Sequence, residues 1–300
     1  MKKQYSESAA QDADWNRLLL FGGAAALLAG IIFRRNLGAE IALFSPVTPP
    51  ASPIDWLLLL QTHRWLGLAY LGIFDLVNVA LVGLMLLSLY LALQRVQPRT
   101  TLIALVLGFL GVAVYLSSNT ALSILSLSHQ YMVSTSETQR ALLLPAATAL
   151  LALNRFSSPG AFPGSGGYVS MFLIAIAGLI FSATLLKNPQ FGRWTAFTGI
   201  IANSLDLMYC LAFPFSPNAV HEKLALFFIP TAGFFLMVWH ILVGARLLYI
   251  ARLSSMPGEL VCIGTKTKDL PAGDNVERPL EFDSIEIGLQ ESHKALARRF

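Results

Sequence analysis

Charged residues are scarce in this chain of 300 residues. Asp, Glu, Lys and Arg make up 13% of it, about half of the roughly 25% that soluble domains carry, and long stretches have none. A hydrocarbon layer of ~30 Å requires a helix with ~18 or more mostly apolar residues, whose backbone groups must all be paired within the segment. Alternating segments of ~10 residues, typical of a membrane barrel, are also missing. The predicted fold is therefore all-α, a polytopic transmembrane helical bundle.

Catalytic and cofactor signatures are absent as well. The two cysteines, Cys210 in an apolar run and Cys262 in a polar tail, imply no disulfide framework. His221 and Glu222 begin a zinc-protease-like string, but Ala225 stands where the second histidine is required. The sequence contains no Walker loop, CxxC pair or Rossmann glycine pattern. We therefore predict no enzymatic activity, no cofactor and no metal site. The basic residues, at the ends of the apolar runs, suit orientation in a membrane better than binding of nucleic acid.

Six apolar runs predict six membrane spans. They are Leu18–Phe33, Trp65–Leu93, Leu102–Leu127, Tyr168–Leu186, Trp194–Phe213 and Leu224–Ile250. Two shorter segments, Ile54–Leu60 and Ala141–Leu153, are of a length more typical of interfacial or re-entrant helices, and the second contains Pro145. Ala141–Leu153 as a seventh span is the alternative.

The distribution of basic residues favours six spans and sets the orientation. Cytoplasmic loops carry an excess of Lys and Arg, and six spans place nine such residues inside against six outside, whereas seven spans give eight against seven. We predict a multi-pass protein of the inner (plasma) membrane with both termini cytoplasmic. It has an N-terminal segment (1–16), a transmembrane domain (17–253) and a polar tail (254–300), whose last part, Phe282–Phe300, has the pattern of an amphipathic helix.

Small residues recur at four-residue spacing in the first span. Gly22, Ala26 and Gly30 share one face, which lets another helix approach closely. Besides the lipid bilayer, the expected partner is a second copy or another membrane protein at this face.

Three segments resemble a bacterial membrane-protein family, the domain of unknown function numbered 4386. Phe191–Tyr209, FGRWTAFTGIIANSLDLMY, is similar to its penultimate helix, and Trp239–Leu253, WHILVGARLLYIARL, to its last helix. Leu89–Val96, LYLALQRV, resembles its short basic turn after the second span. The resemblance covers roughly Leu18–Leu253. It implies a multi-span bacterial membrane protein and no particular activity.

Two aspartates inside apolar runs are the best functional signal. Each costs about 2.5–3.5 kcal/mol at the centre of a membrane helix. Asp75 shares a helix face with Asn78, and Asp206 shares one with Asn203, because each pair is three residues apart. At 1.5 Å per residue, Asp75, Asn119 and Asp206 are predicted to lie roughly 10–15 Å from the outer ends of their spans. Pro230 and Gly233, which can kink the last helix, are expected at a similar level.

This set supports two interpretations. In the first, Asp75, Asn78, Asn119, Asn203 and Asp206 line an outward-facing pocket that binds or transports a small ligand, cation or proton. In the second, these side chains only hydrogen-bond neighbouring helices, and the chain is a non-catalytic scaffold or regulatory subunit. His240, a single histidine beside Trp239, and Pro230 are assigned packing or gating roles. The six-span topology is required for the shared pocket.

Overall fold

The computed structural model describes residues 15–32, 50–154, 165–215 and 218–254, and the predicted amphipathic segment of the tail lies outside these ranges. The described part is helical, and no strand occurs in it. Six regions are long and apolar enough to cross a membrane: Trp15–Ile32, Ile73–Leu93, Pro98–Val133, Gly166–Leu185, Arg193–Ala212 and Phe227–Leu253. The prediction of an all-α multi-pass membrane protein is confirmed at this level.

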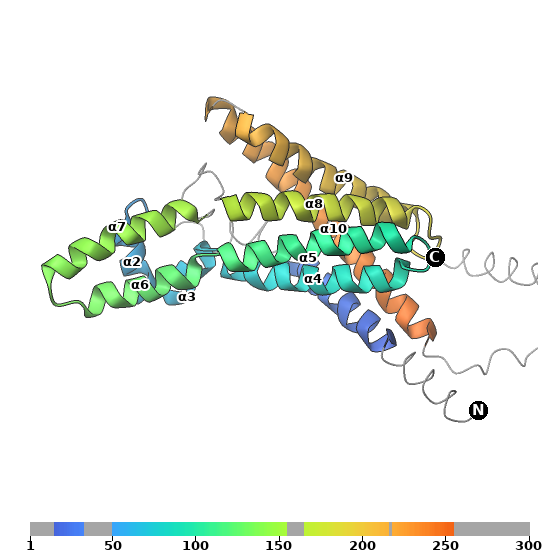
Figure 1. Cartoon of the computed structure of the whole chain (residues 1–300), viewed down its shortest axis with the longest axis horizontal. Coiled ribbons are helices and arrows are strands. Elements are labelled where there is room, and N and C mark those ends of the chain that lie inside the picture. The colour runs from blue at the N-terminus through green and yellow to red at the C-terminus, as the bar shows by residue number, and fades with distance from the viewer. Residues whose placement is uncertain (1–14, 33–49, 155–164, 216–217, 255–300) are drawn as a thin grey trace, which may run out of the picture. The chain divides into compact units, whose positions relative to one another are not determined.

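Six helices form what we call the membrane body. They are the N-terminal helix (Trp15–Ile32), α4 (Ile73–Leu93), α5 (Pro98–Ser118), α8 (Ser165–Leu185), α9 (Arg193–Ala212) and α10 (Asn218–Ser254). Short connections make α4 antiparallel to α5, and α8 antiparallel to α9 (Figure 1). Two of these turns show clear local causes: Pro98 occupies the first turn of α5, and Gly192, just before α9, has a φ of 76° that favours glycine.

Glycines set the spacing of the central helices. A β-carbon added to Gly108 of α5 would stand 2.5 Å from Leu86 Cδ1 of α4 and 3.4 Å from Ala177 Cβ of α8. The helix α5 therefore lies between α4 and α8 at close range. The buried apolar core around this contact includes Met85, Phe181 and Leu247, which are almost fully excluded from solvent. In a membrane such packing, rather than the hydrophobic effect, holds helices together.

Four further helices form a separate bundle, which we call the cap. They are α2 (Pro53–Thr62), α3 (Arg64–Tyr70), α6 (Ala121–Val133) and α7 (Glu137–Leu153). In Figure 1, α6 and α7 lie side by side as an antiparallel hairpin, with α2 and α3 against them. Trp56, Leu60 and Ile124 belong to one buried core of the cap, and Leu57 and Ala147 to a second. The predicted short helices at 54–60 and 141–153 therefore exist, and α7 continues through Pro145.

Two of the predicted spans are interrupted. The run Trp65–Leu93 is divided between α3 and α4 at Gly72, whose φ of 80° is left-handed. The run Leu102–Leu127 is divided between α5 and α6 at Asn119 and Thr120. With 21 residues, α5 is about 32 Å long, which is enough to cross a hydrocarbon layer alone, and α6 adds about 20 Å of helix after the break.

Hydrogen bonds connect the cap to the membrane body where the helices break. Asn154, directly after α7, donates through Nδ2 to Leu71 O at 3.3 Å and to Thr120 Oγ1 at 3.2 Å. Thr120 Oγ1 in turn lies 3.3 Å from Leu150 O, to which it donates. Because Asn154 is 4% exposed, these bonds replace those that water would make. One side chain thus ties together three points where the chain passes between the two bundles.

Candidate functional site

The pair Asp75 and Asn78 lies at the cap-side end of α4. Asp75 is half-buried in the first turn of the helix, so the predicted depth of about 15 Å is wrong: the helix that holds it begins at Ile73, not at Trp65. Asn78 is 3% exposed and continues the buried stripe of Val82, Met85 and Leu89. Its Oδ1 has no hydrogen-bond partner within the described structure. A buried carbonyl oxygen therefore stands one helical turn from a carboxylate.

The side chain of Asn119 is hydrogen-bonded to the backbone between α5 and α6. It ends α5, and its Oδ1 accepts a hydrogen bond from the backbone N–H of Ala121 at 3.0 Å. This bond closes a local turn over Thr120, the N-cap residue of α6. Asn119 therefore lies at the break between α5 and α6, within the apolar run Leu102–Leu127 that was predicted as one span.

The pair Asn203 and Asp206 lies in the second half of α9. Asn203 is 2% exposed, and its Nδ2 donates to Gly199 O of the same helix at 2.7 Å. Its Oδ1 faces α8, because a β-carbon added to Gly178 would stand 2.0 Å from that atom. Asp206 follows one turn later and is half-buried. Here too a buried amide accompanies a carboxylate on one helix face.

The two pairs occupy different levels of the membrane body. Asn203 lies against Gly178, the neighbouring Ala177 lies against Gly108, and Gly108 lies against Leu86 of α4. Asn78 is eight residues from Leu86, or about 12 Å along α4. The helices differ as well, since α9 packs on α8 and α10 whereas α4 packs mainly on α5. The structure therefore presents two Asp/Asn pairs rather than a single cluster of five residues.

Two polar side chains that the sequence analysis did not single out meet at Gly199. A β-carbon on Gly199 would stand 2.2 Å from Ser182 Oγ of α8 and 2.3 Å from Trp239 Nε1 of α10. Ser182 is fully buried and Trp239 is 2% exposed, yet neither of these two atoms has a hydrogen-bond partner among the described residues. Serine and tryptophan are common in apolar helices, so only the facing glycine could have drawn attention to them.

His240 and Pro230 lie at separate points of α10. His240 is 2% exposed, and its Nδ1 lies 2.6 Å from Leu236 O, a contact that requires the proton on Nδ1 because a carbonyl only accepts. Its ring meets that of Trp239 edge to face at 5.2 Å. Pro230 is exposed, and α10 continues through it. The gating role assigned to these residues stays a prediction, and the packing of His240 is evident.

The small-residue face of the N-terminal helix is in contact with helices of the same chain. A β-carbon on Gly22 would overlap Ser88 of α4, and one on Gly30 would stand 2.9 Å from Ile241 of α10. Ala26 is fully buried. The predicted close approach of another helix is thus met by α4 and α10, and a second chain at this face stays a prediction.

Comparison with known proteins adds no assignment. Within the described ranges, no group of three or more His, Cys, Asp and Glu side chains is placed to hold a metal ion. The chain matches no known family, no curated protein and no solved structure. Its function must be argued from the membrane body itself.

Proposed function

We propose that this chain binds a small cation or a proton inside the membrane body and passes it across the membrane. The two Asp/Asn pairs provide the binding groups: Asp75 with Asn78 near the cap, and Asp206 with Asn203 deeper in the body. Carboxylate and amide oxygens are the ligands that hard cations prefer, and a carboxylate also accepts a proton. The resemblance to the bacterial family of unknown function is compatible with this proposal and adds nothing to it.

One observation carries the proposal: two asparagines are buried to 2–3% exposure in an apolar helix bundle, each one turn from an aspartate. Burying a polar group away from water is costly unless it is fully hydrogen-bonded, and Asn78 Oδ1 has no partner in the part of the chain that the structure describes. Ionisable residues in membrane helices are rare and mark ion or proton pathways. A purely structural asparagine would instead bond to a neighbouring helix.

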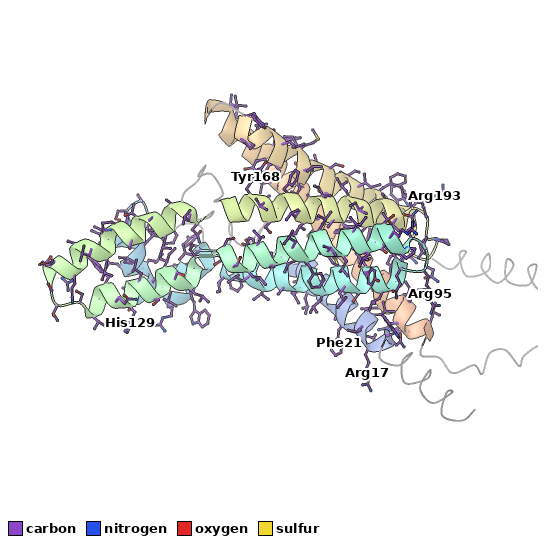
Figure 2. The ribbon with its side chains drawn as sticks, in the orientation of Figure 1. Arg17, Phe21, Arg95, His129, Tyr168 and Arg193 are labelled. Atoms are coloured by element: carbon purple, nitrogen blue, oxygen red, sulfur yellow. The ribbon has the colours of Figure 1, made fainter. Side chains whose placement is uncertain are left out.

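The proposed orientation of the chain in the membrane rests on the distribution of its basic residues. The end of the membrane body away from the cap carries seven basic residues and, within the described ranges, no acidic one: Arg17, Arg95, Arg99, Lys187, Arg193, Arg246 and Arg252. Arg95 and Arg193 are labelled at this end in Figure 2, away from His129 of the cap. By the positive-inside rule we place this end in the cytoplasm of a bacterial cell and the cap outside the inner membrane. Asp75 then faces the outer entrance.

The test is a flux measurement in vesicles. The purified chain is reconstituted into vesicles that contain a dye sensitive to H⁺, Na⁺ or K⁺, and a gradient of the matching ion is imposed in each case. We expect the Asp75→Asn/Asp206→Asn double variant to lower the flux by about tenfold or more, which corresponds to losing ~1.4 kcal/mol of ion binding. Asp55→Asn is the matched control, because Asp55 is exposed on α2 of the cap and should leave the flux unchanged.

Two results would contradict the proposal. One is equal flux in the wild type and the double variant, with both eluting as folded, helical protein. The other is a wild type whose flux does not exceed that of empty vesicles for any of the three ions. Either result would leave the scaffold interpretation as the better account of the chain.

A further inference from the structure

The contact of α8, α9 and α10 at Gly199 brings together two polar atoms with unused hydrogen-bonding capacity. The indole N–H of Trp239 can only donate, and the hydroxyl of Ser182 can donate and accept. The position of a β-carbon on Gly199 is 2.2 Å from Ser182 Oγ and 2.3 Å from Trp239 Nε1. The two atoms are therefore at most about 4.5 Å apart. They do not bond to each other or to any other described group.

Other buried hydroxyls in the same helices donate a hydrogen bond to a backbone carbonyl of their own helix. Thr184 donates to Ile180 O at 2.9 Å, and Thr195 donates to Phe191 O at 2.7 Å, each to the carbonyl four residues earlier. Ser182 has the same option on α8 but its hydroxyl makes no such bond and points to the Gly199 contact instead. The hydroxyl is thus directed at a partner that α8 does not supply.

The surroundings define the chemistry of that partner. The nearest polar side chain on α9 is Asn203, whose Nδ2 is engaged with Gly199 O and whose Oδ1 faces Gly178. On α10 the neighbouring His240 has its proton on Nδ1, bonded to Leu236 O. The described side chains named at this contact include no carboxylate, lysine or arginine, which favours a neutral ligand. A β-carbon on Gly199 would overlap both polar atoms, so a bound group must be very small and must lie on the side of the two atoms away from Gly199.

We propose that Ser182 and Trp239 bind a single water molecule at this three-helix contact. The water accepts from Trp239 Nε1 and exchanges a hydrogen bond with Ser182 Oγ, and a water at ~2.8–3.0 Å from each atom spans their separation. Buried waters of this kind typically make two to four bonds to groups otherwise unsatisfied. Neither Ser182 nor Trp239 belongs to the two Asp/Asn pairs, so the test of this site does not depend on the proposed cation function.

The experiment detects the water through the indole. The full chain, labelled with ¹⁵N, is placed in lipid nanodiscs, and the Trp239 indole N–H signal is identified by its loss in Trp239→Phe. We expect a dipolar cross-peak from this N–H to water that persists when the surrounding lipid is deuterated. In Ser182→Ala the cross-peak should be lost, because one of the two anchors of the water is removed.

Ser170→Ala is the matched control. Ser170 is equally buried on α8 and its hydroxyl also has no partner, but it lies three turns away and contacts α5 near Gly111. This variant should leave the Trp239 cross-peak intact. The proposal is overturned if the wild type shows no cross-peak to water, or if the cross-peak survives in Ser182→Ala at wild-type intensity. Because Ser→Ala removes a single atom, neither variant is expected to prevent folding.

Discussion

Single glycines determine how closely polar side chains approach across the membrane body. Asn203 Oδ1 stands where a β-carbon on Gly178 would be, and Ser182 and Trp239 stand in the same relation to Gly199. Small residues at these points let the helix backbones come close enough for buried amides and hydroxyls to reach the neighbouring helix. The polar chemistry of α8, α9 and α10 therefore depends on residues that carry no polar group themselves.

We predict that Gly178→Ala destabilises the protein. The new methyl group would lie 2.0 Å from Asn203 Oδ1, so the asparagine or the helix must move. Overpacking of this kind costs about 1–3 kcal/mol, more than the roughly 1 kcal/mol that alanine gains over glycine in a helix. The measurement is the free energy of unfolding in detergent micelles, followed by circular dichroism.

Gly83→Ala provides the matched control for this prediction. A β-carbon on Gly83 of α4 would meet Val112 of α5 at 3.7 Å, an ordinary van der Waals contact. We expect its free energy of unfolding to be unchanged or raised by up to about 1 kcal/mol through helix propensity. A Gly178→Ala protein as stable as Gly83→Ala would show that Asn203 is not held against α8.

The sequence identified some of the buried polar residues of the membrane body and not others. Asp75, Asn78, Asn203 and Asp206 stand out in apolar runs because a charged or amide group there is costly. Their pairing by helix faces needs only the three-residue spacing, and both pairs lie on one helix each. Ser182 and Trp239 did not stand out, since both types are ordinary in membrane helices and their meeting at Gly199 depends on how three helices cross.

Helix breaks, which hydropathy does not register, decide the arrangement of the elements. Hydropathy predicts one uninterrupted span from Trp65 to Leu93, because no polar residue at Leu71 or Gly72 marks a break. The left-handed φ of Gly72 nevertheless ends one helix and starts another. Asn119 and Thr120 interrupt the helix in the same way between α5 and α6, where Asn119 Oδ1 accepts a hydrogen bond from the N–H of Ala121. The sequence therefore predicted that these helices exist, but not that two of the apolar runs are each divided between two helices, which places Asp75 in the first turn of α4 and Asn119 at the end of α5.

We predict that Asn154→Ala loosens the cap. The substitution removes the hydrogen bonds to Leu71 O and Thr120 Oγ1 and leaves buried acceptors without this donor, which costs about 1–3 kcal/mol. Hydrogen exchange of the α7 amides, measured by mass spectrometry in micelles, should become faster by about tenfold or more. Exchange in α5 and α8 should stay as in the wild type, because the membrane body has its own core.

Thr148→Ala is the control for the junction. Thr148 is exposed on α7, and its hydroxyl donates to Leu144 O within the same helix. Its removal should change exchange in α7 only slightly. Equal exchange rates in Asn154→Ala and Thr148→Ala would mean that packing of the cap cores, rather than Asn154, holds the two bundles together.

The cap is poor in charged side chains. Residues 50–70 and 119–154 contain four charged side chains: Asp55, Arg64, Glu137 and Arg140. Its surface instead exposes large apolar residues such as Trp65, Leu142 and Val133. Trp65 is 79% exposed beside Arg64, a combination typical of the membrane interface, where tryptophan is enriched. Trp194, equally exposed beside Arg193, has the same features at the opposite end of the membrane body.

At the scale of the whole molecule we predict that α7 does not cross the membrane. Asn154 brings the end of α7 back to Thr120, where α6 begins, so the α6–α7 hairpin starts and finishes at one face of the membrane body. Reporter fusions after Thr135 and Ser157 should therefore both report outside, and fusions after Val96, Lys187 and Leu253 should report inside, as the basic end requires. If Thr135 and Ser157 reported opposite sides, α7 would be a seventh span. Asp75 would then open to the cytoplasm while Asp206 still faced outside, and a common pathway entered from the cap side would be excluded.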